Sequence, residues 1–133
     1  MRHTASSGSP LEPEIGFSRA VRVEAHVVVA GTAPIGPDGE TVGEGDIDAQ
    51  TRRCLDVSAE ALAAVGASRA DVVRTRIMLT DIDRWREAAR VHGEYFSDIR
   101  PAATFVEVSR FIDPRWLVET EIDAIIDGDQ RAR

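Results

Sequence analysis

The residues of this chain best suited to chemistry are carboxylates that alternate along its last apolar segment. Glu119, Glu121 and Asp123 occupy every second position within residues 118–126. Side chains two apart on a strand share one face, so this row must meet water, cations or hydrogen-bond donors. A carboxylate in such a row can serve as a general base or a water-orienting group, or can simply pair with an arginine. Glu119 and Asp123 are interpreted as structural or solvated.

Other residue types that commonly carry chemistry lack partners at a useful spacing. His3, His26 and His92 are far apart in the chain, and Cys54 is the single cysteine. The sequence therefore predicts no metal site and no internal disulfide. His92 is interpreted as a hydrogen-bonded core residue. No Ser-His-Asp arrangement and no phosphate-cradling loop is recognisable.

The elements that must position the carboxylates follow from hydrophobic periodicity. Strands are predicted over residues 17–23, 25–30, 72–79, 104–110 and 118–126. Helices are predicted from Asp46, a plausible N-cap, to about Val65 and from Asp81 or Asp83 to about Phe96. Two helices cannot cover both faces of such a sheet, so we expect an α+β sandwich with both helices on one face. The partly uncovered face favours oligomerisation.

Length and composition limit the remaining possibilities. A chain of 133 residues corresponds to about one domain. We expect a flexible N-terminal segment over residues 1–14, the domain over 15–126, and a polar C-terminal tail over 127–133. The net charge of -7 disfavours broad nucleic-acid binding, and no apolar stretch approaches the length of a membrane span. A cytoplasmic location is the default expectation.

Several short segments, in this order and spacing, resemble the RidA/YjgF family across roughly residues 15–126. They are Gly16-Phe17-Ser18, Val29-Ala30-Gly31-Thr32-Ala33-Pro34, Asp48-Ala49-Gln50-Thr51-Arg52-Arg53-Cys54-Leu55, Ala64-Val65-Gly66-Ala67-Ser68, Asp71-Val72-Val73-Arg74-Thr75, Tyr95-Phe96, Arg100-Pro101-Ala102-Ala103-Thr104 and Val118-Glu119-Thr120-Glu121-Ile122-Asp123-Ala124-Ile125.

The resemblance implies a chorismate-mutase-like (RidA-like) fold, a mixed β-sheet with two helices on one face, assembled as a homotrimer. It further implies small-molecule ligands in clefts between subunits, and no metal or organic cofactor. Family members hydrolyse reactive imines and enamines to 2-oxo acids and ammonia. An arginine holds the substrate carboxylate, and a glutamate of the final strand orients or activates water. The matching glutamate in this chain is Glu121, a candidate general base or water-orienting group by this resemblance. The alternative is an interfacial carboxylate paired with an arginine of a neighbouring subunit.

This chain departs from the family pattern at several positions of the implied site. The arginine position is Ala103, which removes the carboxylate anchor, and the tyrosine and serine positions are Phe17 and Ala30. Glu121 and the backbone site at Gly31 are retained. The residues expected to shape the ligand site are Phe17, Ala30, Gly31, Ala103, Thr104, Phe105 and Trp116. Candidates to replace the anchor are Arg76, Arg100, Arg110 and Arg115.

These departures leave three hypotheses about function. The first is a cofactor-independent hydrolase or deaminase of imine, enamine or related carbonyl metabolites, with a substrate range altered by loss of the arginine. The second is a non-catalytic trimer that binds a small metabolite. The third, ribonuclease or translation-inhibitor activity, is disfavoured by the acidic net charge and the lack of a histidine pair.

Overall fold

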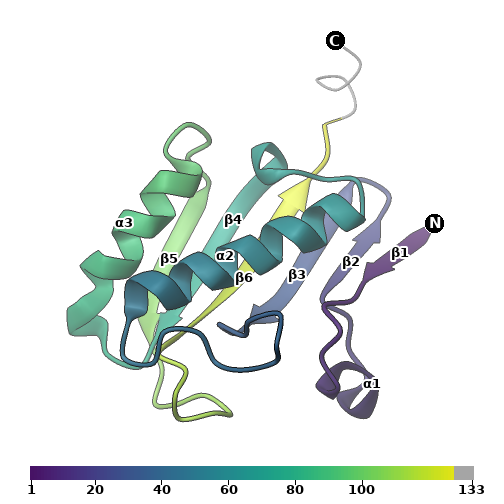
Figure 1. Cartoon of the computed structure of the whole chain (residues 1–133). Helices are drawn as coiled ribbons and strands as arrows, with labels where there is room; N and C mark the ends of the chain where they lie inside the picture. Colours follow the sequence, from purple (N-terminus) through teal and green to yellow (C-terminus); the bar gives the residue numbers. More distant parts are fainter. Residues whose placement is uncertain (128–133) are drawn as a thin grey trace.

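The computed structural model describes residues 1–127, which form one mixed sheet with helices on one side (Figure 1). The six strands lie in the order β1-β2-β3-β6-β4-β5. The pair β4–β5 is parallel and the other neighbouring pairs are antiparallel. The strands are β1 (Arg2–Ala5), β2 (Ala20–Val23), β3 (His26–Thr32), β4 (Val72–Leu79), β5 (Ala102–Glu107) and β6 (Val118–Ile125).

Two long helices cover one face of the sheet (Figure 1). They are α2 (Ile47–Ala64), which packs on β3 and β6, and α3 (Trp85–Phe96), which packs beside α2. A short helix, α1 (Leu11–Ile15), lies near the β1–β2 end of the sheet, and single 3₁₀ turns precede β4 and α3 at Arg69–Asp71 and Ile82–Arg84. The expected α+β class, mixed sheet and one-sided helix layer are confirmed.

Helix α2 begins and ends where its sequence indicates. The Asp46 side chain accepts a hydrogen bond from the Ala49 backbone N–H at 3.1 Å, as an N-cap residue does. Its buried stripe includes Leu55, Leu62 and the fully buried Cys54. Gly66, just past the helix, has a φ of 86° that favours glycine and ends the helical path.

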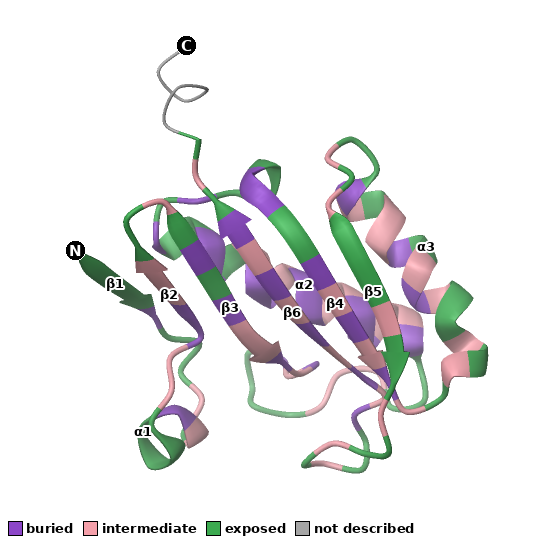
Figure 2. Ribbon diagram, turned by 180° about the vertical axis from the view of Figure 1, so that it is seen from behind, coloured by how far each residue is buried: buried purple, intermediate pink, exposed green. Residues whose placement is uncertain are grey.

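The face of the sheet away from the helices is open (Figure 2). The valine and isoleucine side chains of this face stay about half exposed at Val28 (54%) and Ile125 (43%). Its charged side chains form cross-strand ion pairs, Arg76 with Glu121 and Arg74 with Asp123. The predicted partly uncovered face therefore exists in the single chain.

The N-terminal segment differs from the expectation of a flexible lead-in. Residues 2–5 form the edge strand β1, paired with β2, and α1 follows. The sequence Arg-His-Thr-Ala does not predict a strand, since it has no apolar alternation. Such alternation is not required here, because three of the four residues of this edge strand are exposed. The domain boundary expected at residue 15 stays a prediction. Apart from Asp127, the predicted polar tail lies outside the described residues.

Two strand details also differ from the sequence prediction. The register between β4 and β6 shifts between Val72 and Arg74, so Val72 is buried and Val73 is 43% exposed. Strict alternation over the predicted strand 72–79 would instead place Val73 on the buried face with Thr75. Strand β5 spans Ala102–Glu107 instead of residues 104–110 because its parallel pairing with β4 begins at Ala102 and ends at Glu107.

Candidate ligand-binding site

A cavity of about 140 Å³ opens where α1, the end of β3, α2 and the segment before β6 meet. Most of its wall is apolar, contributed by Leu11, Ile15, Phe17, Ile35, Val57, Ile112 and Trp116. The polar wall includes Gly31 together with four charged side chains: Arg19, Arg53, Glu60 and Glu119. An apolar enclosure with a few polar groups is the usual composition of a small-molecule site.

Arg19 is built into the cavity wall by hydrogen bonds to the protein. It is 7% exposed, and its Nη1 donates to the Gly31 carbonyl oxygen at 2.6 Å and to the Thr32 hydroxyl at 3.3 Å. Its Nε donates to the Ser7 hydroxyl at 3.4 Å, and its guanidinium lies 5.2 Å from the centre of the Phe17 ring. Arg19 therefore organises the site through its Nη1 and Nε atoms.

A buried carboxylate, that of Glu12, lies near Arg19 without lining the cavity. Glu12 is 5% exposed and accepts hydrogen bonds from the backbone N–H and the hydroxyl of Ser7. Burial opposes its ionisation, but these hydrogen bonds and the charge of Arg19 together lower the pKa of Glu12. This contact ties the segment between β1 and α1 to the cavity.

Glu119 differs from these groups because its carboxylate has no hydrogen bond or ion pair with any residue in the described part of the chain. Burial raises the pKa of Glu119, Arg19 acts in the opposite sense, and the nearby Glu121 raises it further. A Cβ atom added at Gly31 would lie 3.3 Å from Glu119 Oε1, so the absence of a side chain there leaves room for this carboxylate. Glu119, interpreted from the sequence as structural or solvated, lines the cavity.

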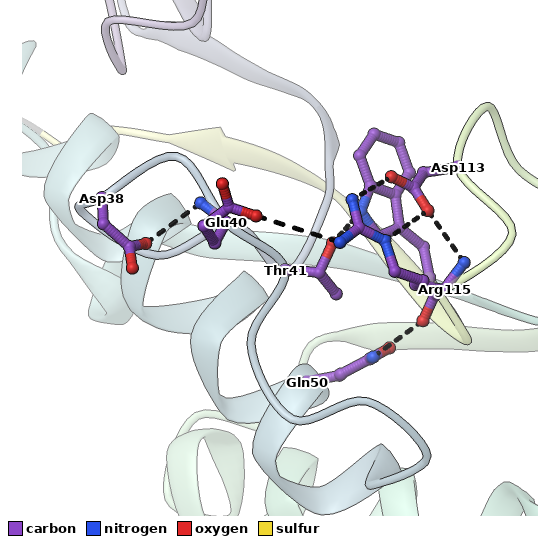
Figure 3. Close-up of polar contacts among 7 residues, drawn as sticks. Asp38, Glu40, Thr41, Gln50, Asp113 and Arg115 are labelled. Atoms are coloured by element: carbon purple, nitrogen blue, oxygen red, sulfur yellow. Dashed lines mark hydrogen bonds and ion pairs between the residues drawn. The ribbon is translucent and has the colours of Figure 1, made fainter.

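Polar contacts join Arg115, in the segment before β6, to Gln50 of α2 and to Glu40 of the loop before α2 (Figure 3). The buried Gln50 side chain donates to the carbonyl oxygens of Gly43 and Arg115 at 3.2 and 3.0 Å and accepts from the Leu117 N–H at 2.8 Å. Trp116 Nε1 donates to the Thr41 hydroxyl at 3.1 Å. The indole is thereby fixed in the wall at 8% exposure.

Glu121 lies outside this cavity, in a row across the open face of the sheet. Its Oε1 accepts from Arg76 Nη1 at 2.5 Å, and the register pairs Arg76 with Thr104 on the other side. The β3–β6 register shifts between Val29 and Thr32, which brings Ala30 and Gly31 opposite Glu121. Gly31 thus belongs both to the cavity and to the open-face row.

The structure brings together only part of the predicted site. Phe17, Gly31 and Trp116 line the cavity, and Ala30, Thr104 and Glu121 fall along the open-face row. Ala103 pairs with Thr75 and Phe105 with Ile77, both of which are buried under the helices. Within one chain, Ala103 and Phe105 therefore face the helix side, away from Glu121.

None of the four arginines considered as replacement anchors lines the cavity in the described part of the chain. Arg76 is paired with Glu121, and Arg115 is paired with Asp113. The arginines that do line it, Arg19 and Arg53, were missed, because the sequence does not show which arginines face a cavity. Arg53 Nε donates to the Ile35 carbonyl oxygen at 2.7 Å.

His92 is half-buried on the helix side, as the sequence predicts. Its Nε2 lies 2.7 Å from the Thr75 hydroxyl, and its ring contacts Phe96 and Phe105. Burial lowers the pKa of His92, which favours the neutral ring. It is not among the residues that line the cavity.

Residues 1–127 contain no group of three His, Cys, Asp or Glu side chains arranged to hold a metal ion. In the same residues, no helix is both long and apolar enough to cross a membrane.

An open-faced mixed sheet with two helices behind it defines an α+β domain, and this one has a cavity at the end of β3. The family model described as Endoribonuclease L-PSP matches residues 8–126, and the chain belongs to this family, also called RidA/YjgF. The family resemblance and its chorismate-mutase-like fold are therefore confirmed.

Individual relatives agree with this assignment. The chain is 36% identical to a RutC family protein of Pyrococcus abyssi over 107 residues, covering 80% of this chain and 82% of the relative. It is 33% identical to the 3-aminoacrylate deaminase RutC of Acinetobacter baylyi over 110 residues, covering 83% and 84%. The crystal structure of Rv2704 from Mycobacterium tuberculosis, a member of the YjgF/YER057c/UK114 family, superposes with a TM-score of 0.86 at 49% identity, covering 95% of this chain and 100% of Rv2704.

Proposed function

We propose that this protein is a cofactor-independent hydrolase of imines, enamines or related carbonyl compounds that lack a small free carboxylate. Family membership and the 3-aminoacrylate deaminase among its relatives support the reaction class. Ala103 at the family's arginine position supports the altered substrate range. We further propose a homotrimer with the ligand in clefts between subunits.

The observation that carries the proposal is the position of Gly31 between two carboxylates. Glu119 approaches Gly31 inside the cavity, and Glu121 lies opposite the Ala30–Gly31 bulge on the open face. A backbone amide beside a carboxylate can polarise a C=N bond while the carboxylate orients the attacking water. Phe17 and Trp116 supply apolar contact area for the rest of the substrate.

The reaction proposed at this site is hydrolysis. Water adds to the imine carbon and gives up a proton, and the resulting carbinolamine carries both a hydroxyl and an amino group. The nitrogen gains a proton, the C–N bond breaks, and ammonia leaves as the hydroxyl oxygen becomes the carbonyl. An enamine enters the same sequence after protonation at carbon. Glu121 is the group proposed to position or activate the water.

The test is a panel of short-lived imines made in situ by an amino-acid oxidase and followed by semicarbazide trapping. The panel contains small, aromatic and carboxylate-free imines. We expect the wild type to accelerate imine loss and Glu121→Gln to lose about 100-fold or more of that rate. Asp123→Asn, on the same strand and face, is the matched control and should retain it.

Ala103→Arg separates this proposal from its alternative. If the wild type has no activity on any imine and Ala103→Arg alone restores it, the natural protein is not an imine hydrolase. The alternative is a binding protein without catalytic activity. The 2.5 Å contact between Arg76 Nη1 and Glu121 Oε1 favours it, because a carboxylate paired with an arginine is less available to activate water. Saturable metabolite binding without turnover would then be expected.

The family description as an endoribonuclease finds no support in the charges of the open face. Arg74 and Arg76 are each paired with a carboxylate there, and the chain has a net charge of -7. A phosphate backbone would meet a surface whose positive charge is already neutralised.

A further inference from the structure

The size of the cavity limits its ligand to a compact molecule. Its volume is about 140 Å³, and an apolar cavity of roughly 150 Å³ lined by leucine, isoleucine and phenylalanine accommodates benzene. The walls here are of the same kind, with Phe17 and Trp116 as the aromatic members. The cavity therefore suits an apolar group of about the size of one six-membered ring.

The polar partners available to such a ligand are few. The Nη1 and Nε atoms of Arg19 are already hydrogen-bonded to Gly31, Thr32 and Ser7. In contrast, the Glu119 carboxylate has no hydrogen-bond partner in the described part of the chain, although it is largely withdrawn from water. A carboxylate in that position gains most from a ligand that brings both a donor and a positive charge.

The charges around the cavity add up to the same preference. Arg19 is attracted by two carboxylates, Glu12 and Glu119, so this group of three carries one net negative charge when all are ionised. On α2, Arg53 and Glu60 contribute one charge of each sign. The four charged side chains that line the cavity therefore sum to zero, and the buried Glu12, which does not line it, adds one negative charge. A cation is favoured over an anion through Glu12 and through Glu119, whose carboxylate has no ion-pair partner in the described residues.

We propose that this cavity binds a small apolar compound with one protonated nitrogen, an amine or iminium, whose nitrogen is held by Glu119 and whose apolar part packs on Phe17 and Trp116. This names the ligand class of the proposed hydrolase and so rests on that function. Binding of unreactive amines can be measured without any turnover, which keeps the two separable.

The experiment is calorimetric titration of the full chain with three matched ligands: benzylamine, benzyl alcohol and benzoate. They share the ring and differ in charge. We expect benzylamine to bind about tenfold or more tightly than benzyl alcohol, as a charge-assisted hydrogen bond provides. Benzoate should not bind measurably, because it would approach Glu119 with the same sign of charge.

Two variants localise the effect. Glu119→Gln should weaken benzylamine binding about tenfold or more and leave benzyl alcohol binding unchanged. Asp123→Asn removes another carboxylate of the same strand face that does not line the cavity, and it should bind all three ligands as the wild type does. Val57→Phe fills the cavity from α2 and should abolish binding of both benzylamine and benzyl alcohol.

The possible results are distinct. Benzoate binding as tightly as benzylamine would identify Arg53 as the polar partner and overturn the proposal. Unchanged benzylamine affinity in Glu119→Gln would overturn it as well. Imine hydrolysis without any benzylamine binding would overturn this ligand class and leave the proposed hydrolase standing. Benzylamine binding without imine hydrolysis would support the ligand class and contradict the proposed hydrolase.

Discussion

Glu119 and Glu121 lie two residues apart on one face of β6, yet their surroundings give them different properties. Glu121 is ion-paired with Arg76 and about 40% of its side chain is exposed. Glu119 is covered by the cavity wall and has no hydrogen-bond partner in the described residues. The two carboxylates have the same spacing in the sequence, but their exposure and pairing differ. The difference arises because β3 pairs with β6 only as far as Thr120, so Glu121 lies within the pairing and Glu119 beyond it.

The raised pKa of Glu119 predicts a pH-dependent loss of stability. Above pH 4.5, the ordinary pKa of a glutamate, the unfolded chain has released the Glu119 proton while the folded protein still holds it. The free energy of unfolding therefore falls as the pH rises from 4.5 to the raised pKa of the folded state. Glu119→Gln should remove that loss and raise the Tm at pH 7 by on the order of 1–3 °C.

Thermal melts of the unliganded protein between pH 4 and pH 8 check this prediction. The gain from Glu119→Gln should shrink towards zero at pH 4, where the wild-type side chain is itself protonated. Asp123→Asn serves as the comparison and should produce no gain at pH 7. A Glu119→Gln variant that melts below the wild type at pH 7 would show that the carboxylate is paired in solution.

At the scale of elements, the long helices and β6 could be predicted from sequence because each carries a complete local signal. Asp46 caps α2, and an unbroken alternation marks β6. Strand β1 and the position of Val73 could not be predicted, because pairing partners and a bulge determine them. Of the cavity lining, Phe17 and Gly31 were candidates from the family resemblance and Trp116 from the apolar character of the departures from it, whereas the buried Arg19 depends on where β3 ends.

Gln50 joins α2 to the segments on both sides of the cavity, and its replacement should loosen all of them. Gln50→Leu leaves the buried Leu117 N–H and the Arg115 carbonyl oxygen without their partner. We expect a loss of about 2–3 kcal/mol in the free energy of unfolding. Urea denaturation measures this loss, and Gln50→Glu, which sets a buried carboxylate against the Gly43 and Arg115 carbonyl oxygens, should lose at least as much.

At the scale of the whole molecule, the open face combines half-exposed aliphatic side chains with paired charges. Val28, Val106 and Ile125 are exposed there beside the Arg74–Asp123 and Arg76–Glu121 pairs. Apolar area with internally neutralised charge is suited to burial against copies of the same surface. A site built partly on this face, like the row through Glu121, would be completed by a neighbouring subunit.

We therefore expect light scattering to give a mass of about three times the 14.5 kDa of one chain. Val28→Lys should shift the protein towards monomers, because it places an unpaired charge in the contact. Ala63→Lys, an exposed position on the helix side, is the matched control and should remain trimeric. A wild type with the mass of a single chain would contradict the expectation.

Cys54 offers a practical consequence of the way α2 packs. It is the single thiol of the chain, fully buried, and its burial raises its pKa well above the ordinary value. A thiol reagent should leave the native protein unmodified and react only when α2 separates from the sheet. The rate of Cys54 labelling therefore measures how often the domain opens. A second cysteine introduced near the cavity can be labelled with a fluorophore while Cys54 stays in place and unmodified.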